Sequence, residues 1–401
     1  MGTALFSIRR NNMKKSKLAL TLGATAALTL SMGVCAMAKN KIIIAGDSTA
    51  CEYGYDDNYA IPRAGWGMYI DKYLDDAEIE NLAKSGRSSK SFTAEDNYTQ
   101  MLSDLGEGDY LFIQFGHNDQ KKSSEEDLNT RYTDPEGDKD TAGSFKNSLY
   151  TSYILPAREK GAIPVLLTPI TRLKYNEDGS VNDSHTLYDD AIRELAEEEG
   201  VICLDMTKAT MENYESVGEE KAKVYHAVYK DSEKGANGLD TTHLNHYGAK
   251  VIASQTAKLM SEDPELKNLV KTTDIDESVT RIDFVKELVR LGDISYDGEL
   301  SFTDIENEED AKAAAAAKSR AIALGVGDDK FEPYRDLKLN EMKLFSQRFA
   351  LSQELDFDIP EDNSEFAQAP DVYALYQKIY FSKVTKQAAA PQSDDEIEKV
   401  E

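Results

Sequence analysis

Runs of apolar residues alternate with helical patterns from Lys41 to about Leu266. Most runs are short, rich in β-branched and aromatic residues, and lack apolar–polar alternation, which is typical of strands covered on both faces. The predicted strands are 42–45, 78–82 (the weakest), 110–115, 164–167 and 201–204. The predicted helices are 67–74, 94–105, 144–160, 187–199 and 247–260. This order predicts a flavodoxin-like α/β fold, a three-layer α/β/α sandwich around a five-stranded parallel sheet.

The pattern changes beyond about Lys271 to an acidic, helical segment with an alanine run, and the chain ends in charged low-complexity sequence. Two polar stretches without periodicity, 121–143 and 173–184, predict surface loops beside the sheet. The expected domains are a signal peptide (1–38), a hydrolase domain (39–266), a small helical region (271–385) and a disordered acidic tail (386–401).

The N-terminus carries the features of an export signal. A basic stretch at 13–17 precedes an apolar stretch at 18–34, and Ala36-Met37-Ala38 resembles a cleavage site. The apolar stretch is shorter than the ~20 residues that span a bilayer. We therefore expect a secreted protein with no transmembrane span after cleavage, the alternative being an uncleaved anchor.

The charge and the cysteine content argue against a nucleic-acid-binding protein and against a fold held by disulfides or zinc. The net charge is −27, from 73 acidic and 46 basic residues, and such a surface repels phosphate backbones, which disfavours nucleic-acid binding. Cleavage would leave Cys51 and Cys203, too few for a disulfide framework and without zinc-ligand spacing nearby. Two buried, hydrophobic cysteines are a better expectation than a disulfide bridge.

The first candidate block is Gly46-Asp47-Ser48-Thr49, directly after the first strand. A serine on a tight strand-to-helix turn is exposed for nucleophilic attack, and the helix N-terminus behind it offers N–H groups to an anion. The alternative is that Asp47 and Ser48 only cap that helix. Trp66, the only tryptophan, follows in a glycine-flanked loop as either a sugar-stacking platform or a core anchor.

The second and third blocks follow the next two strands. In Ser85-Gly86-Arg87-Ser88, Gly86 leaves a backbone N–H open to approach, although a plain turn has the same pattern. In Gly116-His117-Asn118-Asp119, the Asn118 amide can donate to an oxyanion, whereas His117 is predicted to be structural.

The fourth block, residues 240–245, precedes the last helix. Asp240 and His243 lie three positions apart on one predicted loop, so the carboxylate can hold Nδ1–H while Nε2 faces Ser48. The alternative is an Asp–His pair that stabilises a helix start, where His246 is expected as a packing or surface residue. The histidines without an acidic residue at that spacing include His185 and His226.

These four blocks, in this order at one end of a parallel sheet, resemble the SGNH or GDSL hydrolases. The residues that match by position are Ser48, Gly86, Asn118 and His243. Four stretches, 46–50, 64–67, 114–119 and 242–245, are similar to the rhamnogalacturonan acetylesterases of carbohydrate esterase family 12.

The resemblance implies a Ser48–His243–Asp240 triad and an oxyanion hole of the Ser48 and Gly86 N–H groups with the Asn118 amide. It implies no metal or cofactor. The expected substrate is an acetylated plant cell-wall polysaccharide, pectin or rhamnogalacturonan first. The alternatives are a lipolytic or thioesterase SGNH enzyme, or a wall-attached carbohydrate-binding protein with a degenerate hydrolase fold.

The C-terminal region is similar to an S-layer homology module, with one repeat from Val279 and the start of a second at Leu337. Such modules hold exported proteins to the polysaccharides of Gram-positive cell walls. Asn340 departs from the pattern, because it stands where an arginine would be expected. The alternative is a helical appendage without a binding role.

Overall fold

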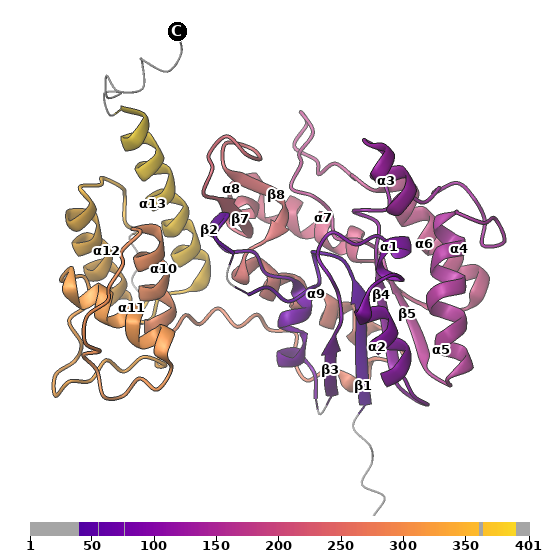
Figure 1. The fold of residues 1–401 in the computed structure, drawn as a ribbon, viewed down its shortest axis with the longest axis horizontal. Helices are drawn as coiled ribbons and strands as arrows, with labels where there is room; N and C mark the ends of the chain where they lie inside the picture. The colour runs from indigo at the N-terminus through magenta and orange to yellow at the C-terminus, as the bar shows by residue number, and fades with distance from the viewer. Residues whose placement is uncertain (1–39, 55, 76, 361–363, 390–401) are drawn as a thin grey trace, which may run out of the picture. The chain divides into compact units, whose positions relative to one another are not determined.

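The computed structural model describes residues 40–54, 56–75, 77–360 and 364–389 (Figure 1). The predicted signal peptide lies outside the described residues. The predicted acidic tail does so from residue 390, and its first residues, 386–389, close the helix α13 (Ala369–Ala389).

The five predicted strands form one parallel sheet in the order β3-β1-β4-β5-β6. They are β1 (Asn40–Gly46), β3 (Ala77–Asn81), β4 (Tyr110–Gln114), β5 (Ile163–Leu167) and β6 (Ile202–Leu204). Consecutive residues point to opposite faces, so Ile43 contributes to one hydrophobic core and its neighbours Ile42 and Ile44 to the other. Both faces are therefore covered, as the apolar runs predicted.

Helices form the two outer layers (Figure 1). One face packs against α1 (Ser89–Phe92), α2 (Asp96–Asp104), α4 (Phe145–Leu149), a π turn (Tyr150–Ile154), α5 (Leu155–Glu159) and α6 (Thr186–Glu199). The other packs against α7 (Met206–Val217), α9 (His246–Glu262) and two 3-10 turns (Trp66–Met68 and Ile70–Tyr73). Two shorter helices are α3 (Glu125–Thr130) and α8 (Glu219–Lys223). The three-layer sandwich is confirmed.

A second, antiparallel sheet was not predicted. Its order is β2-β7-β8, from β2 (Tyr59–Ile61), β7 (His226–Tyr229) and β8 (Leu239–Leu244). β2 is too short to leave a pattern, and the polar sequence of β8 hides a strand that forms only by pairing with β7. The placement of Asp240 and His243 on a loop was therefore wrong, because both lie on β8.

The helix predicted at 67–74 is also wrong, since this segment holds only the two 3-10 turns. The backbone just before the first of these turns is tightly packed, since a Cβ on Gly65 would lie 2.3 Å from the Cys51 carbonyl oxygen. Trp66 is fully buried and its Nε1 donates to Gln114 Oε1 at 2.8 Å. Trp66 is thus a core anchor, and the sugar-platform interpretation is wrong. The stretch 121–143, predicted as loop, contains α3.

The C-terminal region contains α10 (Arg281–Leu291), α11 (Glu308–Ser319), α12 (Leu339–Gln353) and α13. Extended segments that precede α10, α12 and α13 pair with one another through Ser278–Gln368, Thr280–Asp336 and Lys338–Phe366. The structure therefore has three related helix starts, one more than the sequence pattern indicated.

This region packs against the sandwich. Arg290 Nη1 donates to the Tyr59 carbonyl oxygen at 2.7 Å, and the rings of Tyr247 and Tyr373 stack with centroids 6.0 Å apart. The helical C-terminal region is thus present as predicted, and its contacts reach the strand β2.

Both cysteines of the described chain are free thiols, with Cys51 buried and Cys203 only partly buried. Desolvation raises the pKa of each to about 11, so both stay protonated near neutral pH. In the part of the chain that the structure describes, no helix combines the length and apolar character needed to cross a bilayer.

Candidate active site

The structure brings the three predicted triad residues together. Ser48 follows β1, and its Oγ lies 3.0 Å from His243 Nε2. On the other side of the ring, His243 Nδ1 lies 2.8 Å from Asp240 Oδ2. A serine, an imidazole and a buried carboxylate in hydrogen-bonded series is the geometry of an activated nucleophile.

Asp240 is held by further donors. Its Oδ1 accepts the backbone N–H groups of Thr242 and His243, each at 2.9 Å, and its Oδ2 accepts the Tyr59 hydroxyl at 2.8 Å. Burial alone would raise the pKa of Asp240, but His243 and the hydrogen bonds lower it well below its usual range. The group therefore stays a carboxylate that can orient the imidazole. Sequence reasoning missed Tyr59, which lies 181 positions away.

The turn that carries Ser48 differs from the prediction. No helix follows it; the turn closes through Ala50 N–H to Asp47 O, and Asp47 Oδ1 accepts Thr49 N–H at 2.9 Å. The expected helix N-terminus behind Ser48 is therefore wrong, and so is the helix-cap alternative. Ser48 is also only 6% exposed rather than open, and the Tyr53 hydroxyl donates to its carbonyl oxygen at 2.7 Å.

Two backbone donors remain open at this edge of the sheet. Among the described residues, the N–H groups of Ser48 and Gly86 have no hydrogen-bond partner. Gly86 has a positive φ of 78°, and a Cβ there would meet nothing within 4 Å. Asn118 Nδ2 uses one hydrogen to donate to Arg87 O at 2.9 Å, which ties the third block to the second and leaves the other hydrogen. The arrangement can accept a negatively charged oxygen.

Asp119 joins these loops and was not singled out from sequence. Its carboxylate accepts Ser89 N–H at 3.0 Å, the Ser89 hydroxyl at 2.6 Å and Gly116 N–H at 3.1 Å. Burial raises the pKa of Asp119 to about 7 against these hydrogen bonds. It acts as a buried connector between the third block and the start of α1.

The other histidines do not contact Ser48. His117 is buried with Nδ1 3.1 Å from His185 Nε2, and burial lowers the pKa of both rings, that of His185 to about 3. His226 Nδ1 bonds the Asp240 carbonyl oxygen at 2.9 Å, and His246, the first residue of α9, bonds the Tyr69 hydroxyl at 2.6 Å. These contacts agree with the structural and packing roles expected of His117 and His246. Within the described residues, no group of three or more His, Cys, Asp or Glu side chains could hold a metal ion.

The chain matches known proteins over this domain. Residues 44–251 match the GDSL-like Lipase/Acylhydrolase family. A probable rhamnogalacturonan acetylesterase, YesY of Bacillus subtilis, is 35% identical over 56% of this chain and 93% of its own length. The rhamnogalacturonan acetylesterase RhgT of the same organism is 32% identical over 55% and 90%. A rhamnogalacturonan acetylesterase of Emericella nidulans is 30% identical over 59% and 91%.

The family match begins within β1 and spans the other four strands of the parallel sheet, the turn of Ser48 and the strand of His243. The resemblance found in the four sequence blocks is thereby confirmed. The chain belongs to the GDSL-like lipase/acylhydrolase family and is a carboxylic ester hydrolase.

Proposed function

We propose that this protein is a serine esterase that removes O-acetyl groups from cell-wall polysaccharide, rhamnogalacturonan first. The observation that carries the proposal is the Ser48 Oγ–His243 Nε2 distance of 3.0 Å, with Asp240 behind the ring. The named activity of relatives matched over nine-tenths of their length supports the choice of substrate.

In the proposed reaction, His243 Nε2 takes the Ser48 proton as Oγ attacks the acetyl carbonyl carbon. The N–H groups of Ser48 and Gly86 and the Asn118 amide stabilise the oxyanion, each contributing about 3–4 kcal/mol at most. The intermediate collapses, and His243 returns the proton to the departing sugar oxygen. Water, deprotonated by His243, then attacks the acetyl-serine, and acetate leaves as the Ser48 hydroxyl is regenerated.

One assay separates the candidate functions. Acetate release is measured from acetylated rhamnogalacturonan and acetylated xylan, beside hydrolysis of p-nitrophenyl esters of increasing acyl length. A carbohydrate acetylesterase releases acetate from polymer and prefers the acetyl ester. A preference for long acyl chains would instead establish the lipolytic or thioesterase alternative. No release from any ester would contradict the esterase proposal and leave the carbohydrate-binding alternative.

We further propose that the protein is exported and attached to a Gram-positive cell wall through its C-terminal region. The basic and apolar stretches of residues 13–34 support export, and three paired helix starts support a repeat module. The test is co-sedimentation with purified walls of the chain from residue 39 and of one that ends at Asp276. Equal partitioning of the two would contradict attachment and leave a helical spacer.

A further inference from the structure

Arg172 lies beside the triad on the loop that follows β5. Leu173 N–H donates to Thr241 O at 2.8 Å, and Arg172 Nε donates to Thr242 Oγ1 at 3.3 Å. Thr242 immediately precedes His243 on β8. The guanidinium is therefore held one residue away from the imidazole.

Neutral groups hold this guanidinium. Arg172 Nη1 lies 3.1 Å from His185 Nε2, and the ring accepts this hydrogen bond as a neutral imidazole. The Gln120 amide, oriented so that its nitrogen donates to Ser184 O, places its oxygen 2.7 Å from Nη1 and 2.8 Å from Nη2. These acceptors fix the position of the guanidinium and leave its positive charge uncompensated.

Among the described residues, no carboxylate is ion-paired with Arg172. The carboxylates of Asp47 and Asp240 act on it from farther away, but they are bonded to Thr49 and His243. Eight other arginines of the described residues have a carboxylate partner, as Arg193 has in Asp205 at 2.9 Å. In this part of the chain, Arg172 shares the lack of an ion-paired carboxylate with the exposed Arg320 and with Arg348, but of these three only Arg172 contacts a neighbour of His243.

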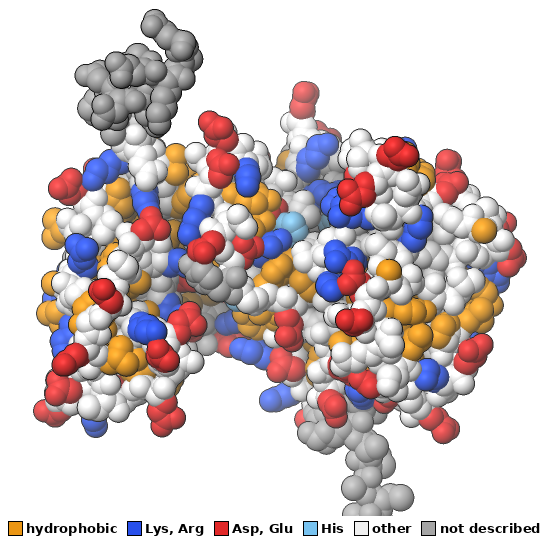
Figure 2. All heavy atoms as spheres, in the orientation of Figure 1, with side chains coloured by type: hydrophobic (Ala, Val, Ile, Leu, Met, Phe, Trp, Pro, Cys, Tyr) orange, Lys and Arg blue, Asp and Glu red, His pale blue; other side chains and the backbone are white. Residues whose placement is uncertain are grey.

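Lys121 is a second cation near this site, because it directly follows Gln120, whose amide contacts Arg172, and its backbone N–H donates to the Asn118 carbonyl oxygen at 3.1 Å. It is exposed, it follows the third block, and no ion pair to its Nζ occurs in the described part of the chain. Partial desolvation and the charges of Arg131 and Arg172 lower the pKa of its ammonium group. Figure 2 shows Lys and Arg side chains beside a histidine, with Asp and Glu side chains among them. The site therefore holds two cations without an ion-paired carboxylate in the described residues, on a protein of net charge −27.

We propose that Arg172, assisted by Lys121, forms an anion subsite that binds the carboxylate of a uronic acid residue of the acetylated polysaccharide. The inference rests on the proposed function, since it places a polysaccharide at the triad. Rhamnogalacturonan alternates rhamnose with galacturonic acid and supplies that carboxylate, whereas the xylose backbone of xylan does not. One Nη2 hydrogen has no acceptor among the described residues and can donate to the ligand.

The test measures how oligogalacturonate, which carries no ester, inhibits hydrolysis of the neutral ester p-nitrophenyl acetate. Arg172→Gln should raise the inhibition constant about 10- to 100-fold, the range of a charge-assisted hydrogen bond. Lys121→Gln should raise it by a smaller factor, and Arg172→Lys should restore part of the loss. Raising the ionic strength should weaken inhibition of the wild type.

Arg131→Gln is the matched control, because this nearby cation is paired with Asp127 at 3.1 Å and should leave inhibition unchanged. The proposal is overturned if Arg172→Gln lowers turnover of p-nitrophenyl acetate but keeps the inhibition constant, since Arg172 would then only position Thr242. Equal inhibition of all variants also overturns it. If Arg172→Gln does not fold, the inhibition constant of Lys121→Gln and the salt dependence of the wild type test the proposal instead. Inhibition that neither the variant nor added salt weakens would overturn it.

The two proposals fail separately. If the wild type releases acetate from xylan but not from rhamnogalacturonan, the proposed substrate is wrong, whatever the inhibition shows. If it deacetylates rhamnogalacturonan and Arg172→Gln binds oligogalacturonate like the wild type, only the anion subsite is wrong.

Discussion

The sandwich and the C-terminal helical region differ in how completely their buried polar side chains are hydrogen-bonded. Beside the candidate site, Asp47 Oδ2, His117 Nε2 and His185 Nδ1 are buried without a hydrogen-bond partner. In the described residues of the C-terminal region, 271–360 and 364–389, no buried side-chain polar atom lacks one. Six further atoms of this kind, on Arg63, Glu80, Asp189, Asn213 and Gln255, also belong to the sandwich, so the difference separates the two regions. Unsatisfied groups carry an energetic penalty, which the C-terminal region avoids.

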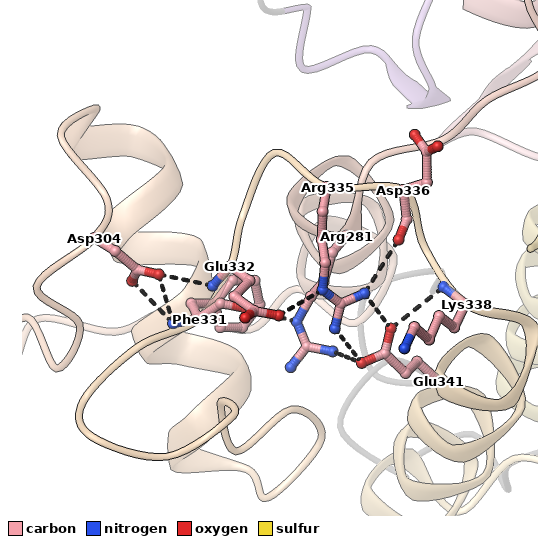
Figure 3. Close-up of polar contacts among 8 residues, drawn as sticks. All are labelled: Arg281, Asp304, Phe331, Glu332, Arg335, Asp336, Lys338 and Glu341. Atoms are coloured by element: carbon pink, nitrogen blue, oxygen red, sulfur yellow. Dashed lines mark hydrogen bonds and ion pairs between the residues drawn. The ribbon is translucent and has the colours of Figure 1, made fainter.

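Figure 3 shows that polar groups of the C-terminal region form hydrogen bonds and ion pairs with one another. Arg281 is buried, donates to Phe331 O at 2.9 Å, pairs with Glu341, and lies over the rings of Phe331 and Phe345 at 4.7 Å. Glu341 also accepts two hydrogen bonds from Arg335, each of 2.7 Å.

The partly buried Arg172 and the fully buried Arg281 therefore differ in what surrounds the guanidinium. Arg281 has a carboxylate and two aromatic faces, which makes it part of the fold. Arg172 has only neutral acceptors, which leaves its charge for a ligand. A wall polysaccharide bound by the C-terminal region would have to contact residues other than Arg281.

The strongest test of the candidate site is Ser48→Ala. We expect acetate release to fall by about 10⁶-fold, because the proposed nucleophile is lost, while the melting temperature stays nearly unchanged. Activity within tenfold of the wild type would show that Ser48 is not the nucleophile.

The roles within the triad can be separated next. His243→Ala should reduce kcat about as much as Ser48→Ala, whereas Asp240→Asn should reduce it less, by about 10⁴-fold, since the imidazole remains as a base. The kcat values of the two variants on p-nitrophenyl acetate are compared. A larger loss in Asp240→Asn would assign Asp240 to holding β8 together with Tyr59.

On the C-terminal side, Arg281→Met should lower the free energy of unfolding by about 3 kcal/mol, because the Phe331 carbonyl oxygen loses its donor and Glu341 loses one of its two arginine partners. Chemical denaturation measures the effect, with Arg335→Gln as the more exposed control, expected to lose about 1 kcal/mol or less. Esterase activity should not change. A loss of activity in Arg281→Met would remove the distinction between the two regions.

The buried Asp189 in α6 should make the stability of the sandwich depend on pH. It is buried with no partner at either carboxyl oxygen among the described residues, and desolvation with the nearby Asp183 raises its pKa to about 8. The folded state then holds a proton that the unfolded chain releases near pH 4, so stability falls as pH rises from about 4 to 8, by up to about 1.4 kcal/mol per unit. Asp189→Asn should therefore raise the melting temperature by several degrees at pH 8 and little at pH 4. An equal shift at both pH values would contradict a protonated Asp189.

The smallest effect is expected from removing the C-terminal region. Val270 pairs with Leu74 and the Ser254 hydroxyl donates to Thr273 O at 2.6 Å, so the chain should end at Asp276 rather than at the predicted boundary of 266. Turnover of p-nitrophenyl acetate should stay within about threefold, because every triad and oxyanion residue lies upstream. A larger loss would mean that Arg290 is needed to hold β2 and, through Tyr59, Asp240.

The sequence alone determined the sandwich and the position of the site. Apolar runs without alternation mark buried parallel strands, and the blocks of Ser48, Gly86 and Asn118 follow three of them, so they meet at one edge of the sheet. The Asp-x-x-His spacing places Asp240 and His243 correctly relative to each other, because three residues is a local distance.

Only the tertiary structure decided which groups support that site. Tyr59 reaches Asp240 across 181 positions, Arg172 reaches Thr242 across 70, and Asp119 reaches Ser89 across 30. None of these contacts leaves a local pattern, since each depends on how separate strands and loops are brought together. The same holds for β8, whose polar sequence becomes a strand only through pairing with β7, and for the different roles of Arg172 and Arg281, which follow from their neighbours in space.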